Sequence, residues 1–185
     1  MQTDYVQRFI FEDLDIRGRL VCLTRTWQQM LEGRAYPPGI VSLLGHTTAL
    51  NVLLGANRKG AGRITTQVQG SGPVRLLVAD CTSELKIRGM AQSEPVKEEV
   101  PERQLLGDGK LAVTLEDGES GRLYQSIVPL EGDSLQAIFE HYLSQSEQLP
   151  AWLRLYADAG AAAGLAVAAL YLAAPRRLVG GAGPD

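Results

Sequence analysis

The sequence predicts an α+β fold, an antiparallel β-sheet core packed by about three helices. Apolar residues repeat at helical spacing in two long stretches, after Pro38 and after Ser134. From Gly62 onward the period changes to two, which is typical of strands with one buried face. The turns between these strands are short, and short turns join antiparallel neighbours because parallel pairs need long crossovers.

The first 22 residues indicate two short strands around a turn. Apolar residues dominate 8–11 and 16–22, and the acidic segment 12–15 separates the two runs. A hairpin is therefore predicted at the N-terminus.

Two helices follow this hairpin. Thr26 and Gln29 have the spacing of a capping box ahead of a short helix, which Gly33 is placed to end. The second helix covers 40–54, where two apolar rows lie side by side. Because the apolar stripe is so wide, we expect two sides of this helix to be buried.

Strands account for most of the chain from Gly62 to Leu130. Three runs alternate apolar and polar residues and are separated by turn signals: 64–68, 74–78 and 85–91. A charged loop bracketed by prolines, 94–103, leads to a second pair of strands, 111–115 and 123–130.

The clearest helix spans 134–149. Five apolar side chains share one of its faces: Leu135, Ile138, Phe139, Tyr142 and Leu143. We expect this face to be buried and His141 to be exposed. Asp133 is positioned to cap the start of the helix and Pro150 to stop it. Residues 153–156 then have the pattern of another strand.

Composition excludes several classes of protein. The 185 residues carry a net charge of −3, so no overall basic field favours nucleic acid or an anionic membrane surface. Asp4 and Arg8 interrupt the apolar stretch that a signal peptide needs, and the uncharged run 159–175, rich in Ala and Gly, is shorter than a membrane span requires. The two cysteines, Cys22 and Cys81, stand alone. A cytoplasmic protein with reduced thiols is expected.

Glycine-rich segments do not match a phosphate-binding loop. Gly55 and Gly60 have the first Walker spacing, but Ala61-Gly62 follows where Lys and Ser or Thr are required. The segments 70–72 and 107–109 lack the third glycine of a dinucleotide fingerprint. We interpret these glycines as turn residues that supply positive φ angles.

Catalytic and metal-binding constellations are also weak. A thiol nucleophile would need Cys22 or Cys81 beside His46 or His141, and neither cysteine has a motif that lowers its pKa. The cysteines and histidines lack the local spacing of zinc ligands. The acidic cluster Glu116, Asp117 and Glu119 lies in a predicted hairpin turn, where solvated carboxylates are expected. We predict no catalytic residue, no metal, no disulfide and no cofactor.

Several motifs resemble one family. The opening segment 8–21, the segment Gln67-Val-Gln-Gly-Ser-Gly-Pro73 and the run 87–91 are similar to the thirty-three-kilodalton heat-shock chaperonin of bacteria, a redox-regulated holdase. The most specific stretch is Tyr124 to Leu135, which contains Leu-Glu-Gly-Asp-Ser-Leu, followed by Ser-Glu-Gln-Leu-Pro at 146–150. The resemblance runs in order from Tyr5 to Ala157.

The resemblance implies an ATP-independent chaperone that binds unfolding or oxidatively damaged clients and prevents their aggregation. It also implies a homodimer; the cytoplasmic location and the absence of nucleic-acid and membrane partners are expected from the composition. In the family a linker and a zinc module follow, with a Cys-x-Cys and a Cys-x-x-Cys pair. This sequence has neither pair, so the redox switch and the zinc are expected to be missing. The resemblance does not identify client-binding residues.

Two segments are therefore expected. Residues 1–158 would form the client-binding and dimerisation core, and 159–185 an atypical tail rich in Ala and Gly. We expect the Ala-rich run of this tail to be loosely docked, or helical by propensity alone, and Gly180–Asp185 to be disordered. A shifted reading frame, a truncation, and a natural short form all remain open as origins of the tail.

Two other functions remain open. The chain could be an inert remnant that binds no client, which light scattering of a heat-aggregating client would reveal. It could also be a small cysteine-dependent enzyme, which replacement of Cys22 and Cys81 by serine would inactivate while leaving a holdase largely intact.

Overall fold

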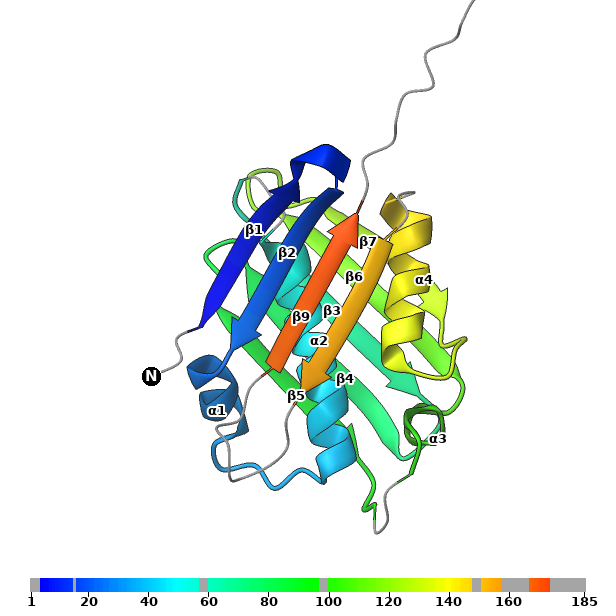
Figure 1. Cartoon of the computed structure of the whole chain (residues 1–185). Helices are drawn as coiled ribbons and strands as arrows, with labels where there is room; N and C mark the ends of the chain where they lie inside the picture. The colour runs from blue at the N-terminus through cyan, green and yellow to red at the C-terminus, as the bar shows by residue number, and fades with distance from the viewer. Residues whose placement is uncertain are drawn as a thin grey trace, which may run out of the picture.

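Two antiparallel sheets enclose a central helix in the computed structural model of the chain (Figure 1). The structure describes residues 4–14, 16–56, 60–96, 100–147, 151–157 and 167–173. The four-stranded sheet has the order β1-β2-β9-β8: β1 (Tyr5–Phe11), β2 (Ile16–Leu23), β9 (Val167–Ala173) and β8 (Ala151–Ala157). The five-stranded sheet has the order β5-β4-β3-β6-β7: β5 (Ile87–Ser93), β4 (Val74–Thr82), β3 (Gly62–Gly70), β6 (Gly109–Asp117) and β7 (Leu123–Pro129).

The helices lie between the sheets and around them. They are η1 (Glu12–Leu14), α1 (Arg25–Leu31), α2 (Pro38–Gly55), α3 (Glu102–Leu106) and α4 (Leu135–Glu147). The predicted α+β class with antiparallel pairing is confirmed. The five-residue α3 adds a fourth α-helix to the three expected, and it begins at the end of the predicted loop 94–103.

The central helix α2 contacts strands of both sheets, so both of its apolar sides are buried as predicted. Its start has Pro38 at the first turn, where the missing N–H costs nothing. By length and composition this helix could cross a membrane, but 72% of it is buried inside the protein. The apolar composition of α2 is therefore accounted for by its place between the sheets.

A buried polar network connects α2 to the five-stranded sheet. The Asn51 Nδ2 group donates to the carbonyl oxygens of Ile64 at 3.0 Å and Ala79 at 2.9 Å. The Thr66 hydroxyl donates to Asn51 Oδ1 at 2.7 Å. Both side chains are fully buried, and each has its hydrogen bonds satisfied. This network fixes the helix in one position over β3 and β4.

The predicted apolar face of α4 is buried, and His141 on the opposite side is exposed, as expected. The predicted cap is wrong. Ser134 Oγ, rather than Asp133, accepts from the Ala137 N–H at 3.2 Å, and Glu102 of α3 accepts from the Leu135 N–H at 2.8 Å. A serine one position nearer the helix reaches the N–H groups of the first turn. Pro150 lies outside the described residues.

The start of α1 also differs from the capping box predicted at Thr26 and Gln29. No side chain of the helix caps its own start. Instead the carboxylate of Asp4, just before β1, accepts from the N–H groups of Thr24 at 2.6 Å, Arg25 at 2.9 Å and Thr26 at 3.0 Å. Burial opposes ionisation of this carboxyl, but these bonds and the one from the Thr26 hydroxyl outweigh it and lower the pKa of Asp4.

Replacing Asp4 with alanine is expected to lower the free energy of unfolding by about 1–2 kcal/mol at pH 7, since the cap is lost. A lowered folded-state pKa stabilises the fold above the unfolded-state pKa, and this contribution is lost as the pH falls through the folded-state value. Urea unfolding should therefore show the difference from the parent chain shrinking below about pH 4. Asp4→Asn keeps an acceptor without the charge, and it should have a smaller effect at pH 7. An undiminished Asp4→Ala effect at pH 2.5, on the order of 1 kcal/mol, would contradict this account.

The Ala-rich run beyond Ala159 was expected to be loosely docked or helical, and this prediction is wrong for residues 167–173. They form β9, which pairs with β2 on one side and with β8 on the other. Strand formation depends on pairing with neighbours more than on local propensity, and β9 has a neighbour on each side. Gly180–Asp185 lie outside the described residues, so their expected disorder stays a prediction.

Candidate functional site

One face of the four-stranded sheet points away from α2, and we call it the outer face. Val21, Leu23 and Leu153 are buried on the opposite side. Because side chains alternate along a strand, the residues next to these three in β2 and β8 have their side chains on the outer face. In β1, Tyr5 pairs with Cys22 and Phe11 pairs with Ile16, so these β1 side chains lie on the outer face too.

Apolar and aromatic side chains dominate the outer face. The described ones are Tyr5, Phe9, Phe11, Ile16, Leu20, Cys22, Trp152 and Tyr156. Tyr5, Phe11, Trp152 and Tyr156 are 40–56% exposed, although such side chains are usually buried. In Figure 1 no helix among the described residues lies in front of this sheet. A contiguous apolar surface of this kind marks an interaction site.

Three of the aromatic side chains on this face contact another aromatic ring or a cation. The Phe9 and Phe11 rings meet edge to face, with centroids 5.5 Å apart. The guanidinium of Arg154 lies 4.3 Å from the centroid of the Trp152 ring. The outer face therefore offers flat aromatic surface together with one cation, which suits extended apolar chains.

The candidate thiol chemistry is not assembled in the described residues. Cys22 is half-buried in β2 and Cys81 is buried in β4, in different sheets with α2 between them. Burial, together with the charge of Asp80, raises the pKa of Cys81 to about 11, so this thiol is protonated at neutral pH. A protonated, buried thiol is a poor nucleophile.

The two histidines have other partners. His46 Nδ1 in α2 lies 3.4 Å from the carboxylate of Glu102, and His141 pairs with Gln145 at 2.8 Å. Burial alone would raise the pKa of Glu102, but the neighbouring His46 and the Leu135 N–H lower it. Glu102 therefore links α2, α3 and the start of α4, and His46 is paired with this carboxylate instead of with a cysteine thiol.

The acidic cluster lies in the β6–β7 turn, as predicted. Asp117 Oδ1 accepts from the N–H groups of Glu119 at 3.1 Å and Ser120 at 2.7 Å, which is the geometry of an Asx turn. No group of three or more metal-ligating side chains occurs in the part of the chain that the structure describes.

The glycines of these segments lie in turns and at the ends of helices and strands, and the prediction that they supply positive φ angles is only partly right. Gly107 has the expected positive φ of 64°. Gly70 and Gly72 do not; instead, an added Cβ would meet the carbonyl oxygens of Leu106 at 2.0 Å and Leu105 at 2.5 Å. These two glycines are needed for close backbone packing against α3.

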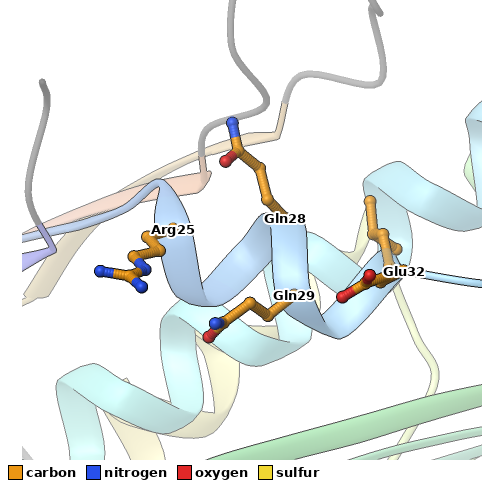
Figure 2. A pocket seen from close by; sticks show the side chains of 5 residues that line it. Arg25, Gln28, Gln29 and Glu32 are labelled. Atoms are coloured by element: carbon orange, nitrogen blue, oxygen red, sulfur yellow. The ribbon is translucent and has the colours of Figure 1, made fainter.

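Surface hollows elsewhere are open and lack convergent chemistry. One lies along α1 and is lined by Arg25, Gln28, Gln29, Leu31 and Glu32. In Figure 2 the side chains of Gln28 and Gln29 point to opposite sides of the helix. A second hollow, of about 300 Å³, lies between β1 and β2 and is lined by arginines that include Arg8 and Arg17.

Sequence reasoning left the client-binding residues unknown, and the structure brings exposed aromatic side chains together on the outer face as a candidate site. The signal in the sequence was the alternation of Tyr5, Phe9 and Phe11 in one strand. Trp152 and Tyr156 repeat it far along the chain. Alternation shows that a strand has an apolar face, but not that the face lacks a cover.

The fold is a helix enclosed by two antiparallel sheets, and one sheet has an apolar face that no helix covers in the described part of the chain. Comparison with known proteins shows which family has this fold. The family described as Hsp33 protein matches residues 4–173, which include β9. The chain belongs to the Hsp33 family.

Individual relatives are similar over most of this chain. It is 43% identical to the 33 kDa chaperonin of Hahella chejuensis over 166 residues, which are 89% of this chain and 58% of the relative. For the 33 kDa chaperonin of Shewanella loihica the identity is 39% over the same shares. The chain thus spans a little more than half the length of these curated relatives.

A solved structure has the same fold. The 33 kDa chaperonin of Thermotoga maritima superimposes with a TM-score of 0.79, over 91% of this chain and 60% of that protein, at 21% sequence identity.

Proposed function

We propose that the chain is the client-binding core of a holdase chaperone, which binds unfolding proteins on the outer face without ATP. The observation that carries this proposal is the exposure of Tyr5, Phe11, Trp152 and Tyr156 on a sheet face that no helix covers among the described residues. An unfolding client exposes apolar surface, and covering it removes the driving force for aggregation. The membership in the Hsp33 family and the names of the relatives support a chaperone rather than an enzyme.

The family and the composition support a dimeric, cytoplasmic chaperone without a redox switch. The chain acts as a homodimer in the cytoplasm, on clients damaged by heat or oxidation, without nucleic acid or membrane partners. Its two cysteines are Cys22 and Cys81, so the 185 residues bind no zinc and carry no disulfide switch.

The test is the suppression of aggregation of a heat-denatured client, followed by light scattering without nucleotide. The chain should suppress scattering in a dose-dependent manner. Phe11→Ser combined with Tyr156→Ser removes two exposed aromatic groups from the outer face. The double variant should need at least about tenfold more protein for half suppression, because each of the two aromatics contributes about 1–2 kcal/mol of apolar burial and about 1.4 kcal/mol corresponds to a factor of ten.

A matched control replaces two exposed apolar residues outside the outer face, Leu85→Ser with Met90→Ser, which are 39% and 42% exposed in the parent chain. This variant should suppress scattering as the parent chain does. The proposal fails if the parent chain does not suppress aggregation. It also fails if the outer-face variant is as active as the control.

Oxidation is expected to leave the activity of this chain unchanged. Cys22 and Cys81 belong to different sheets, so peroxide cannot join them in a disulfide without disrupting the fold. Light scattering after peroxide treatment checks this, and purified protein should contain well under one equivalent of zinc. Activation by roughly tenfold after peroxide would show that a thiol switch operates in these residues.

A further inference from the structure

The two sheets have four edge strands, β1, β8, β5 and β7, and these differ in whether side chains cover them. An edge strand presents unpaired N–H and C=O groups that can accept another strand. At the β8 edge, side chains of α4 hydrogen-bond to these backbone groups. Glu140 accepts from the Leu153 N–H and Gln136 accepts from the Leu155 N–H, each at 3.1 Å.

The β5 edge is covered in the same manner by the segment between α1 and α2. The Ala91 N–H donates to the Tyr36 hydroxyl at 3.2 Å, and Arg34 donates to the Gly89 carbonyl at 2.6 Å. Side chains therefore close one edge of each sheet.

The other two edges, β1 and β7, are open. Among the described residues β1 is hydrogen-bonded only to β2, and β7 only to β6. The outward backbone groups of β1 therefore pair with no other strand in this part of the chain. Edge strands that are protected from pairing usually contain prolines or several charged residues. The sequence of β1, Tyr-Val-Gln-Arg-Phe-Ile-Phe, has no proline and a single charge.

The outer face distinguishes β1 from β7. A strand added to β1 would extend the outer face, and its alternate side chains would lie beside Tyr5, Phe9 and Phe11. The outward face of the five-stranded sheet beside β7 is mixed: Gln67, Lys110 and Gln125 share it with Ile127, which is 55% exposed. This face offers no aromatic side chain along β7, so on the outward faces an added segment finds aromatic contact at β1 and not at β7.

We infer that clients bind as an additional β-strand on the open edge of β1, with their apolar side chains on the outer face. This inference rests on the proposed function and specifies its substrate class. The preferred client is an extended segment with apolar residues at alternate positions, whose backbone pairs with β1 while its side chains contact the aromatic groups. Backbone pairing is independent of sequence, and this independence allows many different clients to bind.

The experiment uses the full chain and a fluorescent peptide of alternating valine and serine residues, with binding followed by anisotropy. In an extended peptide the N–H groups of the valines point to one edge and those of the serines to the other. N-methylation of the valines therefore blocks one edge, and N-methylation of the serines blocks the other. A peptide that adds to β1 uses one edge only, so at least one of these two peptides should bind like the parent. A peptide methylated on both edges should bind roughly tenfold more weakly, because the strand pairing is lost.

Amide hydrogen exchange then locates the peptide. Alternate amides of Tyr5–Phe11 should gain protection in the complex, while those of Leu123–Pro129 in β7 should not change. Equal binding of the doubly methylated peptide would overturn strand addition, and so would protection in β7 instead of β1. These outcomes leave the proposed function intact if the chain still suppresses client aggregation; loss of suppression by the parent chain would refute the function itself.

Discussion

Replacing Phe139 with alanine is expected to lower the free energy of unfolding by about 3–5 kcal/mol. The ring is fully buried on the apolar face of α4, where this helix packs against β8 and α2. Truncation removes apolar contact and leaves a cavity that the close-packed core refills only in part. Equilibrium unfolding in urea, followed by circular dichroism, measures the loss.

Two control variants separate packing from helix propensity. Phe139→Leu keeps most of the apolar volume and should cost under about 1.5 kcal/mol. His141→Ala lies on the exposed side of α4 and should change stability by less than about 0.5 kcal/mol. A loss below about 1 kcal/mol for Phe139→Ala would mean that α4 is not docked on the core through this face.

The elements with strong periodicity could be predicted from the sequence. The apolar face of α4 repeats at three and four residues, and the burial of Leu135 and Phe139 follows from that spacing alone. The strands from Gly62 to Leu130 were found by their period of two. Both signals are local, so they need no knowledge of the neighbours.

Features that depend on distant parts of the chain were missed. The cap of α1 comes from Asp4, 20 or more residues before the N–H groups that it accepts from. Alanines with little strand preference make up part of β9, and the strand is fixed by its pairing with β2 and β8. Neither a partner far along the chain nor a neighbouring strand can be recognised from the local spacing of residues.

The candidate site was missed for the same reason. Each strand of the outer face is apolar on one side, and local spacing suggests the core side. In the fold α2 occupies one side of the four-stranded sheet, while the side with Phe11 and Tyr156 has no cover among the described residues. Exposure is therefore a property of the assembled layers and not of any single strand.

Replacing Asn51 with leucine is expected to lower the free energy of unfolding by about 3–5 kcal/mol, because three buried polar groups each lose a hydrogen bond. In the parent chain Asn51 satisfies the carbonyls of Ile64 and Ala79 and the hydroxyl of Thr66. A leucine at this position offers no donor or acceptor, and water does not reach the space between α2 and the sheet without disturbing the packing. Equilibrium unfolding in urea measures this loss as well.

A double-mutant cycle with Thr66→Val tests whether the network itself is responsible. Valine removes the hydroxyl that Asn51→Leu leaves unpaired, so Asn51→Leu with Thr66→Val should be less destabilised than the sum of the two single variants. We expect a coupling of about 1–2 kcal/mol, since one buried hydroxyl is no longer left without a partner. Additive effects would contradict the network and would attribute the cost of Asn51→Leu to the larger volume of leucine. In that case α2 would be positioned over β3 and β4 by apolar packing alone.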